Sequence, residues 1–112
     1  MAADRQIILD TLNGIIVESG AAVFTIEDHY VQVAVEGPSE IYCEAVSHHY
    51  HSSIDINLES SFVKMGFLLE EGGNYSRRYL GVGAERLADD IVFIFEEIYR
   101  SNPAAEFEVT EL

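Results

Sequence analysis

Cysteine and basic residues are both scarce in this sequence of 112 amino acids. Cys43 is the only cysteine, so no disulfide can form within the chain, and a reducing cytoplasm is the expected location. Six Lys and Arg residues face twenty Asp and Glu residues, which leaves a net charge of −14. This charge argues against sequence-independent binding to nucleic acid or to an anionic membrane, because both need phosphate groups to be neutralised by basic side chains.

Long hydrophobic runs are also missing. No stretch reaches the length of a membrane span, and no basic segment followed by an apolar one opens the chain, so we expect neither a transmembrane helix nor a signal peptide. Hydrophobic residues still make up 48% of the sequence, which is enough for one core. We expect a single α+β domain over residues 1–103 and a loosely held acidic tail over residues 104–112.

The first half of the sequence changes from helical to alternating periodicity. Apolar residues at helical spacing predict a helix from about Asp4 to Ser19, and Gly20 follows as a stop. Alternation then predicts three strands, over residues 23–27, 30–35 and 40–47. Because the connections between them are short, these strands must form an antiparallel meander. One face of the second strand is all valine and is expected to face the core: Val31, Val33 and Val35.

The second half predicts a helix, a hairpin and a further helix. Asp55 or Asn57 can cap a short helix that ends at Gly66. A hairpin over residues 67–71 and 75–82 follows, and then an amphipathic helix from Gly83 to the Asn102-Pro103 pair. The predicted order is α-β-β-β-α-β-β-α. Both long helices are expected on one face of a five-stranded antiparallel sheet.

The outer face of this sheet is the predicted partner-binding surface. If the valines face the helices, Gln32, Glu44 and the tyrosines of the second and third strands point outward. On the fifth strand we expect Leu80 and Val82 to face inward. An uncovered face rich in tyrosine has the composition of an interface, although cross-strand aromatic pairs that stabilise an exposed sheet and a dimer contact are alternatives. The predicted binding residues are Tyr30, Tyr42, Val46, Tyr75, Arg77 and Tyr79.

Catalytic and metal-binding patterns are weak. His49 and His51 are remote candidates for metal ligands, but one segment alone supplies them, whereas zinc sites draw paired ligands from two segments. Cys43 lies in an alternating strand with no base placed beside it. The paired acidic residues of the last helix fit a solvated surface. We therefore expect neither an enzyme nor a cofactor.

A series of local motifs resembles a known family. The motifs are Phe62-x-x-Met65-Gly66-Phe67, Gly73-Asn74-Tyr75-Ser76-Arg77 and Leu87-Ala88-Asp89, with Ile98-Tyr99 closing the helix. Together with the order of elements, they resemble the type III secretion chaperone fold, which YbjN-type proteins share. The resemblance implies a non-enzymatic, often dimeric, acidic cytoplasmic protein that holds a partner segment extended or partly unfolded on apolar patches.

Two functions from different classes fit these features. The first is a small bacterial chaperone-like protein, a homodimer, that binds a partner protein or peptide on the outer face or along an open sheet edge. The second is an acidic immunity or inhibitor protein that blocks a basic surface of a toxin or enzyme. Salt separates them, because binding by charge weakens strongly at high ionic strength and apolar capture does not.

Overall fold

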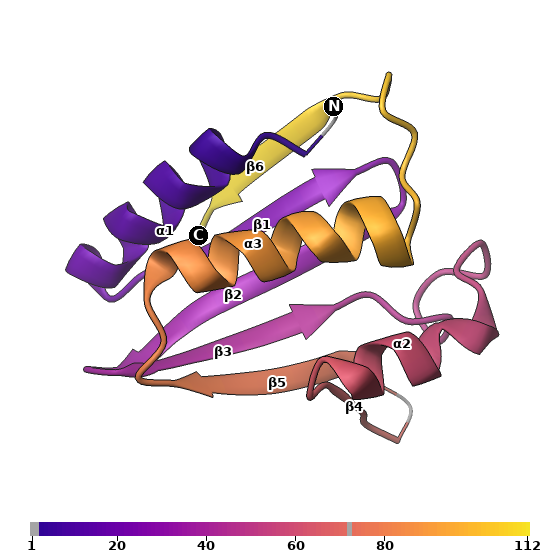
Figure 1. Ribbon diagram of the computed structural model, residues 1–112, viewed down its shortest axis with the longest axis horizontal. Coiled ribbons are helices and arrows are strands. Elements are labelled where there is room, and N and C mark those ends of the chain that lie inside the picture. Colours follow the sequence, from indigo (N-terminus) through magenta and orange to yellow (C-terminus); the bar gives the residue numbers. More distant parts are fainter. Residues whose placement is uncertain (1–2, 72) are drawn as a thin grey trace.

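The structure, a computed structural model, describes residues 3–71 and 73–112. These residues form three α-helices and one antiparallel sheet of six strands, in the order β4-β5-β3-β2-β1-β6 (Figure 1). The helices are α1 (Arg5–Glu18), α2 (Glu59–Lys64) and α3 (Ala84–Phe93), with short helical segments η1 (Ile56–Leu58) and η2 (Ile94–Ile98). The strands are β1 (Ala21–Ile26), β2 (His29–Gly37), β3 (Glu40–Ala45), β4 (Leu68–Leu69), β5 (Tyr75–Leu80) and β6 (Phe107–Glu111).

Helix α1 has the ends that its sequence predicts. The Asp4 carboxylate accepts hydrogen bonds from the backbone N–H groups of Gln6 and Ile7, at 3.0 and 3.2 Å, and so satisfies donors that the first turn leaves unpaired. Ser19 ends the helix in the left-handed conformation (φ 56°). The prediction of a helix from about Asp4 to Ser19 is confirmed.

Strands β1, β2 and β3 form the predicted antiparallel meander. Val33 pairs with Ala22 of β1 and with Cys43 of β3. Since side chains alternate along a strand, these three residues share one face, and all three are buried. Burial also raises the pKa of the Cys43 thiol far above its ordinary value.

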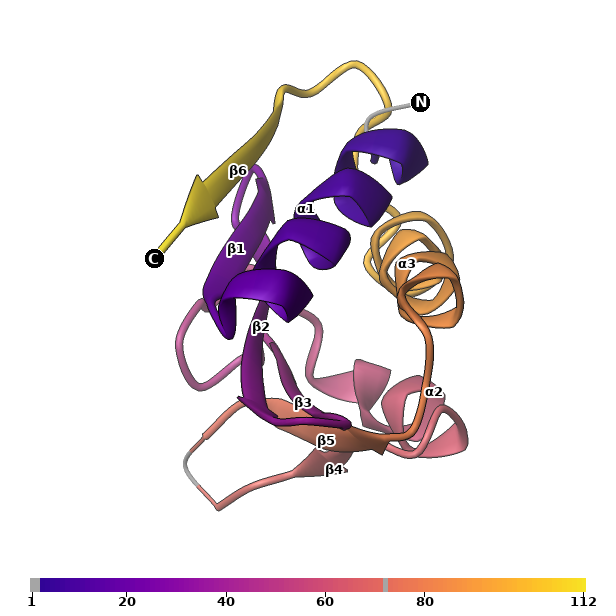
Figure 2. The same cartoon turned by 90° about the vertical axis from the view of Figure 1, so that its left-hand side faces the viewer.

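Helices α1 and α3 lie against this same face, and the sheet curves around them (Figure 2). We call it the covered side and the opposite face the open face. On the covered side Phe24, Val31 and Val33 are buried together with Leu12 of α1 and Ile91 of α3. The placement of both long helices on one face is confirmed.

The C-terminal segment is a strand, so the prediction of five strands is wrong. β6 pairs with β1 along its whole length, from Ile26 opposite Phe107 to Ala22 opposite Glu111. Phe107 stacks on Phe24, with ring centroids 6.1 Å apart, and this contact holds part of the expected acidic tail in the sheet. The last helix is therefore followed by one more strand.

Strand β5 faces opposite to the prediction. Tyr79 pairs with Ile41 and Tyr75 with Ala45, which places Tyr75, Arg77 and Tyr79 on the covered side. Leu80, expected to be inward, is 67% exposed. The physical reason is aromatic packing. Tyr75 stacks on Phe62 of α2 with ring centroids 4.1 Å apart, and the rings of Tyr75 and Tyr79 together bury more apolar area than the side chain of Leu80 would.

Helix α3 ends earlier than predicted. Its regular part passes into η2, a π-helical segment, and Arg100 then takes a positive φ of 53°. The turn closes when the Ser101 N–H bonds to the Phe95 carbonyl at 2.9 Å. Asn102 and Pro103 lie beyond this end. Of the helices in residues 3–71 and 73–112, none is both long enough and apolar enough to cross a bilayer.

Candidate functional site: the open face of the sheet

The open face carries the side chains that alternate with the buried ones. The pairing registers place fifteen residues there. They are Ala21, Val23 and Thr25 of β1, Tyr30, Gln32 and Ala34 of β2, Glu40, Tyr42 and Glu44 of β3, Leu68 of β4, Ser76, Arg78 and Leu80 of β5, and Glu108 and Thr110 of β6. In Figure 2 none of the described helices lies over them.

The centre of the open face is almost without charge. Away from its Arg78 end, strands β1, β2 and β3 place eight residues on it, and Glu44 is the only charged one of these eight. All eight side chains are half-buried, including the small ones of Ala21 and Ala34. Glu40 of β3 also belongs to the open face, but it lies at that end, where it pairs with Arg78. On a chain with a net charge of −14, this is a distinctive neutral area.

A polar network joins the two tyrosines of this face. Glu44 accepts a hydrogen bond from the Tyr42 hydroxyl at 3.0 Å and another from the Asn74 side-chain amide, also at 3.0 Å. The same amide donates to the Tyr30 hydroxyl at 2.9 Å, and the Asn74 carbonyl oxygen accepts from the Ser47 N–H at 2.9 Å. Asn74 is 6% exposed, so a buried amide fixes the Tyr30 ring directly and the Tyr42 ring through Glu44, whose carboxylate it satisfies.

Arg78 closes one end of the face. Its guanidinium carbon lies 5.0 Å from the centre of the Tyr42 ring, within cation–π range. It also pairs with Glu36 and Glu40 at 3.0 Å each. The hydrogen bond that Arg78 donates to Glu36 raises the pKa of Arg78, although a side chain 53% exposed gains little stability from such pairs. The sequence predicts Arg77 on this face instead of Arg78, because the pattern of β5 favours the opposite orientation of its side chains.

The six predicted binding residues do not come together. Tyr30 and Tyr42 lie on the open face as predicted. Tyr75 and Tyr79 are buried on the covered side, so they cannot form part of an exposed surface. Val46 is buried as well, beyond the end of β3, where its carbonyl accepts the Tyr99 hydroxyl at 2.6 Å.

Arg77, the sixth predicted residue, is half-buried on the covered side. Its guanidinium donates to the Met65 carbonyl and stacks over Tyr79, 4.2 Å from the ring centre.

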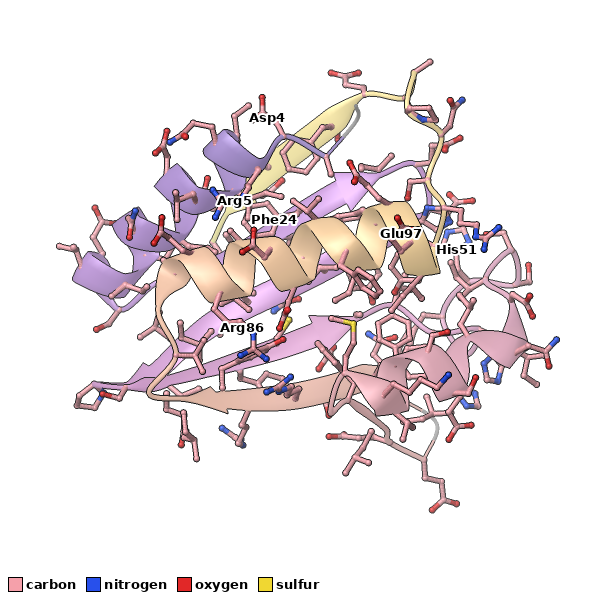
Figure 3. All side chains as sticks on the ribbon, in the orientation of Figure 1. Asp4, Arg5, Phe24, His51, Arg86 and Glu97 are labelled. Carbon is pink, nitrogen blue, oxygen red and sulfur yellow. The ribbon has the colours of Figure 1, made fainter. Side chains whose placement is uncertain are left out.

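The histidine-rich segment, residues 48–51, does not form a metal site in the described structure. The His48 and His49 rings lie 4.2 Å apart, while His51 lies in an exposed loop (Figure 3) and its Nε2 is 3.4 Å from the Asp28 carboxylate. In the part of the chain that the structure describes, no three histidine, cysteine or acidic residues are placed to hold one ion.

His29 forms a separate polar contact at the end of β2. Its ring stacks on Tyr99 with centroids 4.8 Å apart, and its Nδ1 lies 2.7 Å from the Ser101 hydroxyl. Burial, the largest cause, lowers the pKa of His29, partly offset by the charges of Glu27 and Asp28. These contacts tie the segment that follows η2 to the sheet, beside a pocket of about 420 Å³.

The sheet has two open edges. Leu112 donates its N–H to the Ala21 carbonyl at 2.9 Å, and inward-bonded and outward-facing residues alternate along an antiparallel strand. The backbone groups of Phe107, Val109 and Glu111 therefore point away from β1, toward the edge. At the other edge β4 pairs with β5 only at Tyr75 and Ser76.

Comparison with known proteins gives no assignment: no protein-family model matches this chain, and neither does any curated protein or solved structure.

Proposed function

We propose that this is a non-enzymatic, chaperone-like protein that binds a segment of a partner polypeptide on its open face. The observation that carries the proposal is the neutral centre of that face. Half-buried apolar and tyrosine side chains lie there without a covering helix, and Glu44 is already bonded to Tyr42 and Asn74. Desolvating this area on binding therefore costs less than desolvating the acidic remainder of the surface.

The sheet also supports an extended partner. The outward backbone groups of β6 can pair with an added strand, whose alternate side chains would lie on the open face. We propose kinship with the type III secretion chaperone fold on the order of the elements up to α3, with β6 as an addition. A homodimer in the cytoplasm is part of the same proposal.

A pair of charge-matched variants tests the binding surface. Ala34→Glu places a carboxylate at the centre of the open face, whereas Val17→Glu adds the same charge at a position on α1 that is 84% exposed. We expect Ala34→Glu to lose capture of the partner from a lysate of the source cells, and Val17→Glu to keep it. Both variants should remain folded by circular dichroism. Equal capture by the two variants would contradict the proposal.

The distribution of acidic residues favours a second candidate, an inhibitor of a basic protein. The outer surfaces of α1 and α3 carry exposed carboxylates, among them Asp10, Glu18, Glu85 and Asp89. A basic partner bound there would dissociate as salt is raised, and Ala34→Glu would leave its binding intact. Capture that survives high salt and is lost in Ala34→Glu supports the open face instead.

A further inference from the structure

A second site lies on the covered side, at the junction of α2, β5 and α3. It is a surface pocket of about 430 Å³. Three of its lining residues are basic, although the whole chain has only six basic residues. We call it the basic pocket, and it is lined by Lys64, Met65, Gly66, Arg77, Arg86 and Asp90.

Arg77 is held in place at the pocket wall. One of its guanidinium nitrogens donates to the Met65 carbonyl, and the plane of the group stacks on Tyr79, 4.2 Å from the ring centre. Tyr79 is fixed in turn, because its hydroxyl donates to Asp90 at 2.8 Å. A guanidinium held from two sides keeps its remaining N–H donors in a fixed arrangement.

The remaining donors of Arg77 form no ion pair in the described part of the chain. Within the described residues Arg77 and Lys64 have no acidic group at ion-pair distance, and Arg86 reaches Asp90 only at 3.6 Å with a side chain 61% exposed. By contrast, Arg5 and Arg78 are paired with carboxylates at 2.7 and 3.0 Å. Three cations against one carboxylate leave the basic pocket with a local charge of +2.

Gly66 shapes the floor of the pocket. It has a positive φ of 86°, and a Cβ atom at this position would lie 3.3 Å from three atoms of the Arg77 guanidinium. Glycine therefore lets the guanidinium lie directly against the backbone. A side chain here would press on Arg77 and narrow the approach.

We propose that the basic pocket binds an oxyanion, a phosphate or carboxylate group of a small organic molecule. Planar guanidinium groups bind both anions in bidentate fashion. The volume exceeds that of a bare ion and falls in the range of small-molecule sites. The net negative charge of the chain does not prevent binding, because at physiological ionic strength charges beyond about 8 Å are largely screened. The site is independent of the open face, since Arg77 lies on the other side of the sheet.

The test is an NMR titration of the ¹⁵N-labelled protein at constant ionic strength. Inorganic phosphate and acetate are the two probes, with chloride as the balancing ion. We expect saturable shifts at the amides of Gly66 and Arg77 and at the Arg77 Nε. Saturation by phosphate alone assigns the site to phosphate groups, saturation by acetate alone assigns it to carboxylates, and saturation by both supports the shared oxyanion chemistry. Linear shifts with both probes would overturn the proposal.

Two double variants with the same net charge provide the control. Lys64→Gln with Arg86→Gln removes two exposed cations of the basic pocket, and should weaken binding by about tenfold or more. Arg5→Gln with Arg100→Gln removes two cations elsewhere and should leave the affinity unchanged (Figure 3 shows Arg5 on α1, and Arg86 on α3). Equal weakening in both doubles would show a general charge effect and overturn the site. Because all four side chains are at the surface, melting temperatures should confirm that both doubles fold.

Discussion

Tyr75 and Tyr42 lie on neighbouring strands and on opposite faces of the sheet, and their surroundings differ completely. Tyr75 is buried against Phe62 with its hydroxyl unpaired among the described residues. Tyr42 is half-buried, bonded to Glu44 and stacked by Arg78. The comparison shows that the presence of a tyrosine in a strand does not reveal on which face of the sheet its side chain lies. On the covered side the ring fills the core, and on the open face the ring and hydroxyl form part of a surface network.

The largest effect should come from truncating these two tyrosines. Tyr75→Ala removes a fully buried ring, so we expect it to lower the free energy of unfolding by about 3–5 kcal/mol. Tyr42→Ala, the matched change on the open face, should cost about 1 kcal/mol or less, for one surface hydrogen bond and one stacking contact. Urea denaturation measures both. Similar costs would mean that the two faces are not distinguished as described.

The assignment of β6 side chains to the two faces depends on its register, and proline substitution tests this register. The N–H of Thr110 points toward β1, whereas the N–H of Val109 points to the open edge. Thr110→Pro should therefore lower the free energy of unfolding by roughly 1–2 kcal/mol more than Val109→Pro, because it removes a hydrogen bond of the sheet. Thermal denaturation of the two variants gives the comparison. The reverse order would place β6 one residue out of register.

The hydroxyl groups of the covered tyrosines should give effects of opposite sign. Tyr75→Phe removes a buried hydroxyl that has no hydrogen-bond partner in the described residues, so the variant should be neutral or up to about 1 kcal/mol more stable. Tyr79→Phe leaves the half-buried Asp90 without its 2.8 Å donor and should cost about 1 kcal/mol. Calorimetric melting of both variants is the measurement, and a loss of stability in Tyr75→Phe would contradict the assignment.

The smallest effect is the pH dependence contributed by His29, which lies on the covered side at the end of β2. Burial lowers its pKa in the folded state below the ordinary value of 6.5. As the pH falls through about 6.5, His29 becomes protonated in the unfolded chain before it does so in the folded chain. Its contribution therefore lowers the free energy of unfolding as the pH decreases. The loss ends once the pH is below the folded-state pKa.

Comparison with His29→Gln isolates this contribution, because the carboxylates titrate equally in both proteins. As the pH is lowered from 8 to 5, the free energy of unfolding of the wild type should decrease relative to that of His29→Gln. A difference that does not change with pH in His29→Gln would show that the ring does not resist protonation in the fold.

The meander could be predicted from the sequence because its turns and its alternation agree. Val31 and Val33 alternate with polar residues, and the Gly37-Pro38-Ser39 turn fixes the next strand, so only one register buries the valines. The open face of β2 and β3, with Tyr30 and Tyr42, follows from that register. Half of the candidate site was therefore accessible from local pattern alone.

Strands β5 and β6 could not be predicted in the same way. The alternation in β5 sets two tyrosines and an arginine against Ser76, Arg78 and Leu80, so either face could be buried, and the choice depends on Phe62 of α2, which is distant in sequence. In β6 the glutamates suggested a solvated tail, whereas the deciding contact is Phe107 on Phe24. Both errors arise where tertiary packing outweighs local composition.

The burial of Cys43 has a practical consequence. Its thiol lies on the covered side with no exposed surface, and its pKa is raised by burial, so the reactive thiolate form is suppressed in the native protein. A maleimide or nitroxide reagent would thus modify only a cysteine introduced at the surface. Fluorophores or spin labels can be attached at chosen positions on either face without removing the native cysteine.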